Sequence, residues 1–196
     1  MLYREVYQMT LINSNMTLLK YADDSAYRFQ IEYLDQSIVY TNHSIPYLIN
    51  DALKIEGASL KSREHYAKYV LNISKLLPIL IYASEDFVLF PTSAKSNYNY
   101  MLINSKHIVH IDAYKHYTKL LLINQQTKVI YHENHIISRK LGESLRLIQF
   151  QKHHLYSQNP SVNIKKVVTH SLRNGFFCHS ILTCYLHLIT MLGMHY

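Results

Sequence analysis

The chain has 196 residues, of which 48% are hydrophobic, and it contains 18 Tyr, no Trp and only 4 Gly. This composition excludes a disordered, low-complexity or fibrous chain and leaves a globular protein with one core-bearing domain. The formal net charge is +7, so the surface carries an excess of positive charge.

That charge is unevenly distributed. Residues 1–60 contain four basic and seven acidic side chains, whereas residues 61–196 contain sixteen basic and six acidic ones. A net charge of −3 is therefore followed by one of +10. The positive field of the second part favours an anionic partner, either nucleic acid or an acidic membrane surface.

Few residues offer catalytic or metal chemistry. The cysteines, Cys178 and Cys184, allow one disulfide at most, and the N-terminal sequence lacks the basic start and apolar core of a secretory signal, so we expect a cytoplasmic protein. The thirteen histidines show no common zinc spacing, and no phosphate-binding loop or nucleophile elbow is present. We therefore expect no cofactor, no metal and no enzyme, although a small hydrolase that uses a histidine as base stays an alternative.

The N-terminal region predicts a β-meander. Val6–Ile12 and Met16–Tyr21 are strand candidates on either side of an Asn-Ser-Asn turn, and residues 27–33 alternate aromatic or aliphatic with polar side chains. Ser37–Thr41 adds a fourth strand. We expect one buried and one solvated face, and the acidic balance makes this meander a poor phosphate-binding surface.

Two segments follow before the centre of the chain. Ser44 and Pro46 are a helix start signal, and Gly57 is an end signal, so Ile45–Glu56 is expected to be a helix. Ser59–Lys68 places basic side chains among tyrosines, which a nucleic-acid surface requires for phosphate contact and stacking. A solvated helix or loop with ordinary surface lysines is the alternative.

The centre of the chain is a predicted buried hairpin over Lys75–Thr92. Two apolar runs of strand length enclose a Ser-Glu-Asp turn, and Pro78 and Pro91 bracket the expected ladder. Phe87 and Leu89 alternate with Val88 and Phe90, so at least one of these pairs is expected to be buried.

This stretch resembles the central segment of ComK-type competence transcription factors. The likeness rests on Asn72-Ile73-Ser74-Lys75, on Pro78-Ile79, and on Phe87 to Thr92 with its Phe-Pro-Thr ending. It extends upstream through Gly57 and Lys61-Ser62-Arg63 and downstream to about Gln151, roughly the middle half of the chain. Leu77 stands where the family usually has a proline, and little likeness continues beyond His153.

The resemblance implies a transcription activator that recognises paired A·T-rich boxes through the minor groove of double-stranded DNA. It also implies homo-oligomers, with dimers that pair on the DNA, and control of genes for DNA uptake. In the family the C-terminal part serves adaptor-mediated proteolysis. Because the tail of this chain departs from the family pattern, we do not carry the proteolytic adaptor over.

The second half predicts further short strands and one helix. Strand candidates are Tyr100–Asn104, His107–Tyr114, Lys119–Asn124 and Lys128–His132, with lysines at their margins that a sheet presents at its rim. The alternative is that these lysines protect the edges of the sheet from pairing with strands of other molecules. Ser138–Gln151 reads as an amphipathic helix with Leu141, Leu145 and Ile148 on its apolar side and its charged residues mostly off that stripe.

The C-terminal region separates at Asn159-Pro160, and Phe176–Tyr196 contains no Asp, Glu, Lys or Arg. A packed or dimer-forming helix, an unordered tail and a membrane anchor are the alternatives for this stretch, and its histidines and cysteines argue against the membrane. We expect a single DNA-binding domain over residues 1–155 and a helical tail over 156–196.

Together these patterns predict an α+β protein, with a β-rich core of short, mostly antiparallel strands and two or three packing helices. The predicted function is DNA-binding activation of competence genes, and the alternative is a non-enzymatic interaction protein, membrane-associated through residues 176–196. Arg63 is the predicted groove residue because arginine suits a narrow A·T-rich groove. The full set of predicted DNA-binding residues is Lys61, Arg63, Lys68, Lys75, Lys95, Lys115, Lys119 and Lys128.

Overall fold

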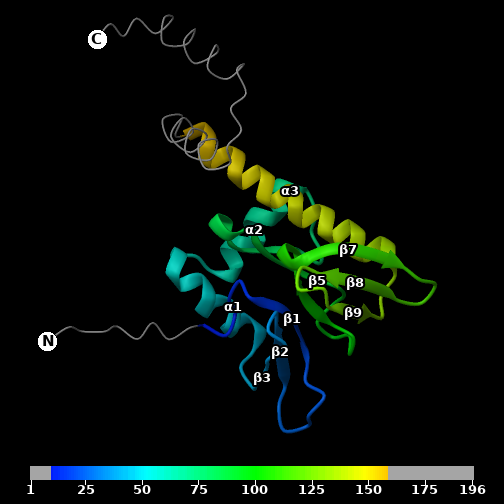
Figure 1. Cartoon of the computed structure of the whole chain (residues 1–196). Coiled ribbons are helices and arrows are strands. Elements are labelled where there is room, and N and C mark those ends of the chain that lie inside the picture. Colours follow the sequence, from blue (N-terminus) through cyan, green and yellow to red (C-terminus); the bar gives the residue numbers. More distant parts are fainter. Residues whose placement is uncertain (1–9, 159–196) are drawn as a thin grey trace, which may run out of the picture. The chain divides into compact units, whose positions relative to one another are not determined.

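Two antiparallel sheets and three α-helices make up the part of the chain that the computed structural model describes, residues 10–158 (Figure 1). The predicted α+β class with a β-rich core is confirmed. The chain divides into two compact units, Met1–Lys152 and His153–Tyr196, and the architecture below is that of the first.

The larger sheet has six strands in the order β3-β2-β1-β6-β5-β4. Its strands are β1 (Met16–Tyr21), β2 (Phe29–Tyr33), β3 (Ile38–Thr41), β4 (Ile79–Tyr82), β5 (Phe87–Pro91) and β6 (Met101–Asn104). At its centre Leu19 lies opposite Ile31 on one side and opposite Leu102 on the other. The N-terminal meander is therefore joined to the central hairpin through the β1–β6 pair.

The first predicted strand is wrong over its described residues. Residues 10–12 form no strand because side chains bend the backbone: the Thr10 hydroxyl donates to the Ile12 carbonyl (2.8 Å), and the Asn13 amide donates to the Thr10 carbonyl (3.2 Å). Residues 6–9 lie outside the described part. The solvated face predicted for the meander is also partly covered, since Gln30 on β2 is only 2% exposed.

The central hairpin is confirmed as β4 and β5, with a short 3₁₀ turn (Ala83–Glu85) between them. Pro78 precedes β4, and Pro91 is the last residue of β5, as the missing proline N–H requires. Phe87, Val88, Leu89 and Phe90 are all fully buried, so both alternating pairs lie in cores on opposite faces of the sheet.

Two helices connect the meander to the hairpin. Helix α1 (Ile45–Leu53) begins after the Ser44 cap and continues as a 3₁₀ turn to Glu56, where Gly57 ends it at φ 61°. Helix α2 (Leu60–Leu71) begins with a capping box in which Ser59 and Ser62 bind each other's backbone N–H. The start of α1 follows the Ser44 and Pro46 signal, whereas Ile55, which lies within the predicted helix, is 74% exposed.

The smaller sheet contains β7 (Ile108–Ala113), β8 (Thr118–Leu122) and β9 (Thr127–Ile130), close to the predicted strands. Helix α3 (Asn134–Gln158) follows and begins four residues before the predicted start. Its buried stripe matches the predicted one only in part, because Ile148 is buried as predicted. Leu145 is 48% exposed, whereas Lys140 and Ser144 are buried together with the apolar Ile137, Leu147 and Ile148.

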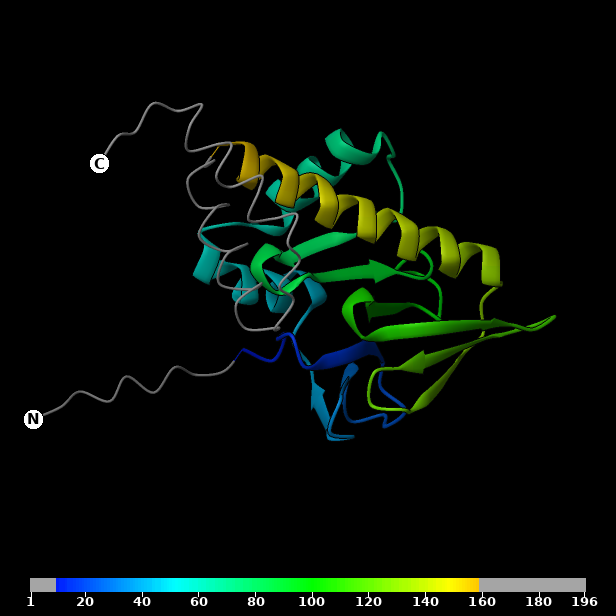
Figure 2. The same cartoon turned by 45° about the horizontal axis from the view of Figure 1, so that its top comes forward.

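The layers follow from the two faces of the six-stranded sheet. Helix α1 packs on one face, over a core that includes Leu19, Phe87 and Leu89. The opposite face, which includes Phe90 and Val88, is covered by the smaller sheet and by α3, as both views show (Figures 1 and 2). The predicted break at Asn159-Pro160 and the apolar stretch Phe176–Tyr196 lie outside the described residues.

Candidate nucleic-acid interface

The basic side chains of the described part fall into two classes. Some lie within ion-pair distance of a carboxylate, and these are Lys20, Lys54, Arg63, Lys106, Lys128, Arg139, Lys140 and Lys152. Within residues 10–158 no such partner is found for Arg28, Lys61, Lys68, Lys75, Lys95, Lys115, Lys119 or Arg146. Of the eight predicted DNA-binding residues, six thus have no carboxylate partner among the described residues, whereas Arg63 and Lys128 have one.

Arg63 is one of the two that are neutralised. Its guanidinium forms an ion pair with Glu56 and lies 3.5 Å from the carbonyl oxygen of Ile81 on β4, and its side chain is only 15% exposed. It therefore ties α2 to the end of α1 and to the edge of the large sheet. Its role as groove residue stays a prediction, and this placement favours a structural role.

Lys128 is the other. Its ammonium lies 2.6 Å from Glu32 Oε2, so the pair links β9 of the small sheet to β2 of the large one. The acidic meander and the basic second half are thus joined by a partly buried ion pair. A DNA phosphate would have to compete with Glu32 for this lysine.

The outer face of α2 presents Lys61, His65 and Lys68, all exposed and spaced at i, i+4 and i+7. Tyr69 is 75% exposed beside them, so the predicted mixture of basic and aromatic side chains does reach the surface. Glu64 lies between Lys61 and Lys68 on the same helix and reduces the positive potential of this face.

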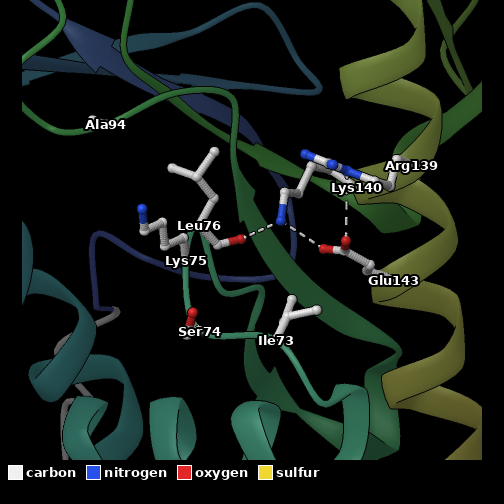
Figure 3. A pocket seen from close by; sticks show the side chains of 8 residues that line it. All are labelled: Ile73, Ser74, Lys75, Leu76, Ala94, Arg139, Lys140 and Glu143. Carbon is white, nitrogen blue, oxygen red and sulfur yellow. Dashed lines mark hydrogen bonds and ion pairs between the residues drawn. The ribbon is translucent and has the colours of Figure 1, made fainter.

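Lys75 lines an open pocket of about 790 Å³ (Figure 3). The pocket is formed by the loop after α2, by Ala94 next to Lys95, and by the first turns of α3, with the lining residues Ile73, Ser74, Lys75, Leu76, Ala94, Arg139, Lys140 and Glu143. Lys75 and Arg139 lie on opposite sides of it in this view. Segments distant in sequence thus place basic side chains at one opening, which suits an anionic ligand.

A buried lysine, Lys140, connects two of the segments that line this pocket. The Lys140 ammonium donates to the Leu76 carbonyl (2.6 Å) and to Glu143 Oε2 (2.6 Å) (Figure 3). Arg139 lies 3.7 Å from the same carboxylate and keeps 59% of its side chain exposed. Sequence reasoning missed both residues, because the amphipathic pattern placed them off the packed side of the helix.

Lys115 and Lys119 belong to the β7–β8 hairpin. Lys115 is exposed in the connecting loop, and the Lys119 ammonium lies 5.4 Å from the centre of the Tyr114 ring. The six predicted residues without a described carboxylate partner therefore lie in three groups: the face of α2, the pocket with its neighbouring loop, and this hairpin.

Metal sites and membrane-spanning helices are two other features that residues 10–158 could contain. No three His, Cys, Asp or Glu side chains there could together hold a metal ion. None of the helices in that range combines the length and apolar character that crossing a membrane requires.

The comparisons agree with the sequence resemblance. A search of curated proteins and a search of solved structures gave no match. The family model described as ComK protein matches residues 6–153, which include every described strand and all three groups of basic residues. The chain therefore belongs to the ComK family, a family of competence transcription factors.

Proposed function

We propose that this protein is a DNA-binding activator of competence genes that recognises A·T-rich boxes through the minor groove of double-stranded DNA. Membership of the ComK family supports the regulatory role. We place the DNA-binding domain in residues 1–155, in a cytoplasmic protein that binds as dimers pairing on the DNA.

The observation that carries this proposal is the set of lysines without a carboxylate partner in residues 10–158. Lys61, Lys68, Lys75, Lys95 and Lys115 are exposed on a chain whose residues 61–152 hold thirteen basic and six acidic side chains. Lysines that are not neutralised by the protein can neutralise phosphates and release the counterions condensed on DNA. Their contacts supply affinity and orientation and carry no sequence information.

Selectivity in the minor groove has a distinct chemical signature. A·T and T·A pairs present nearly the same acceptors there, whereas a G·C pair adds the guanine 2-amino group. A protein that reads this groove should prefer A·T to G·C and discriminate weakly between A·T and T·A. Inosine lacks the 2-amino group, so an I·C pair resembles A·T in the minor groove and G·C in the major groove.

The test is a titration of the full-length protein with three duplexes of equal length that carry A·T, I·C or G·C boxes. We expect the A·T and I·C duplexes to bind within about threefold of each other and the G·C duplex to bind more weakly. If the I·C and G·C duplexes bound equally weakly, the protein would recognise its boxes through the major groove. The absence of binding to all three would favour the alternative, a non-enzymatic interaction protein.

The phosphate contacts are tested by salt. Lys68→Ala should reduce the magnitude of the log–log slope of affinity against salt by about 0.9, the value for one phosphate. Lys20→Ala is the matched control, because Lys20 is already paired with Asp23 at 3.0 Å and belongs to the acidic meander. A slope that changes equally in both variants would contradict the assignment of the unpaired lysines.

A further inference from the structure

The β7–β8 hairpin projects from the rest of its unit. The two strands are joined by four residues, Tyr114 to Tyr117, and the Tyr114 N–H donates to the Tyr117 carbonyl (3.0 Å) to close the loop. In both views the tip extends beyond the other elements, at the end where α3 begins (Figures 1 and 2). An extended ribbon of this kind offers its tip to a partner without a rearrangement of the core.

The tip carries positive charge that residues 10–158 leave unneutralised. Lys115 is exposed and forms no ion pair with a described carboxylate, and the neighbouring His116 is exposed as well. The nearest acid along the hairpin is Asp112, which lies opposite Lys119 in the strand register and is already in contact with His110 (3.1 Å). The loop itself is therefore the most positive part of this ribbon.

Two stacked tyrosines hold the loop. The rings of Tyr114 and Tyr117 are 4.6 Å apart at an interplanar angle of 13°, and Lys119 lies over the Tyr114 ring. Stacking and a cation–π contact stabilise one loop conformation, which lowers the entropy lost when the loop binds a ligand. Tyr114 nonetheless stays 44% exposed, so one aromatic surface remains available for contact.

We propose that this tip enters the minor groove of A·T-rich DNA, with Lys115 and His116 directed at the groove floor, the tyrosine pair against the sugars, and Lys119 on a phosphate. The inference rests on the proposed function and names the element that would read the groove. The minor groove is about 6 Å wide, and a two-stranded ribbon with strand axes about 4.8 Å apart is wider than this once its backbone atoms and side chains are counted. Only side chains of the tip can therefore reach into the groove, while the strands stay outside it. The strong negative potential of a narrow A·T groove attracts inserted lysine and histidine, and β-ribbon proteins are known to bind this groove.

The structure provides a matched control for this proposal. Lys61 and His65 on α2 are also one lysine and one histidine, both exposed and without a described carboxylate partner. They lie on a helix face that we assign to phosphate contact. The double variants Lys115→Ala/His116→Ala and Lys61→Ala/His65→Ala therefore remove the same formal charge from two different places.

The experiment measures the affinity of both double variants and of the unchanged full-length protein for the A·T, I·C and G·C duplexes. Thermal unfolding of each variant checks that it is folded. We expect the hairpin variant to lose about tenfold or more of its preference for A·T and I·C over G·C. The α2 variant should bind all three duplexes more weakly and keep the preference.

A hairpin variant that keeps its preference, with or without a uniform loss of affinity, would overturn the inference and leave the proposed function intact. Equal loss of preference in both variants would overturn it as well, since groove reading would not be confined to the hairpin. If the unchanged protein bound none of the duplexes, the proposed function itself would fail.

Discussion

At the residue scale, His107 makes folding sensitive to pH. It is 4% exposed, its Nε2 lies 2.6 Å from the Ser14 carbonyl oxygen, and its Nδ1 has no described hydrogen-bond partner. Burial lowers the pKa of this imidazole below its ordinary value, and the charge of Lys106 lowers it further, while the contact with Ser14 opposes both. A second ring proton would be a buried donor without a partner.

The sign of the pH effect follows from this shift. The unfolded chain binds the proton first as pH falls, because the folded pKa lies below the unfolded value of about 6.5. The folded state gains its full stability from neutral His107 at pH values above the unfolded pKa. This contribution is lost as pH falls toward the folded pKa. Urea unfolding at pH 7.5 and pH 5 should show a larger loss of stability in the unchanged protein than in His107→Gln, which keeps a donor for Ser14. If both proteins lost the same stability between pH 7.5 and pH 5, His107 would not be the source of the pH dependence.

Residue types could be predicted from the sequence, but their partners could not. The lysines and arginines of the second half are visible as a charge excess, and Lys61, Lys68 and Lys115 are indeed exposed. Arg63 and Lys128 are held by Glu56 and Glu32, and no local pattern indicates that these carboxylates come close. Pairing between distant segments depends on tertiary structure, so the assignment of free and neutralised charges required the fold.

At the scale of an element, the loop between α2 and β4 depends on α3. Leu76 adopts φ 50°, a left-handed conformation that is unfavourable for a residue with a side chain, and its carbonyl accepts from the buried Lys140. Lys140→Met would leave both this carbonyl and Glu143 without the ammonium. We expect the free energy of unfolding to fall by about 3–5 kcal/mol, measured by chemical denaturation.

The double variant Lys140→Met/Glu143→Leu is the control for that measurement. It removes the carboxylate that in the single variant keeps only the more distant Arg139, at 3.7 Å, as ion-pair partner, so part of the lost stability should return. If the double variant were no more stable than the single one, the loss of the Lys140 partner of Glu143 would not be the source of the destabilisation.

Elements with a regular local pattern were predictable. The strands β1 to β5, the Ser44 cap and the end at Gly57 follow alternation or capping chemistry. The buried side of helix α3 was predicted only in part: Ile148 is buried as expected, but the packed stripe also includes Lys140 and Ser144, which a hydrophobic pattern excludes. Buried polar residues are recognised only when their hydrogen-bond partners are known.

At the scale of the whole molecule, Phe90 joins the two sheets. It is fully buried in a cluster with Leu18 and Ile103 of the large sheet and with Leu120, Leu122 and Ile130 of the small one. Phe90→Ala removes this shared contact and should lower the free energy of unfolding by about 3–5 kcal/mol through lost burial and a cavity. Ile55→Ala, at a residue 74% exposed, should change it by no more than about 0.5 kcal/mol in the same denaturation experiment. A denaturation midpoint that Phe90→Ala leaves unchanged would contradict this account of the core.

The order β3-β2-β1-β6-β5-β4 also has a consequence for synthesis on the ribosome. Strands β1 to β3 leave the exit tunnel first and can pair locally, but the second edge of β1 has no partner until β6 has been made. An open edge is a site at which nascent chains pair wrongly, and a charged side chain on it discourages such pairing. Lys20, which lies opposite Met101 in the finished sheet and 3.0 Å from Asp23, is the charged side chain of this strand.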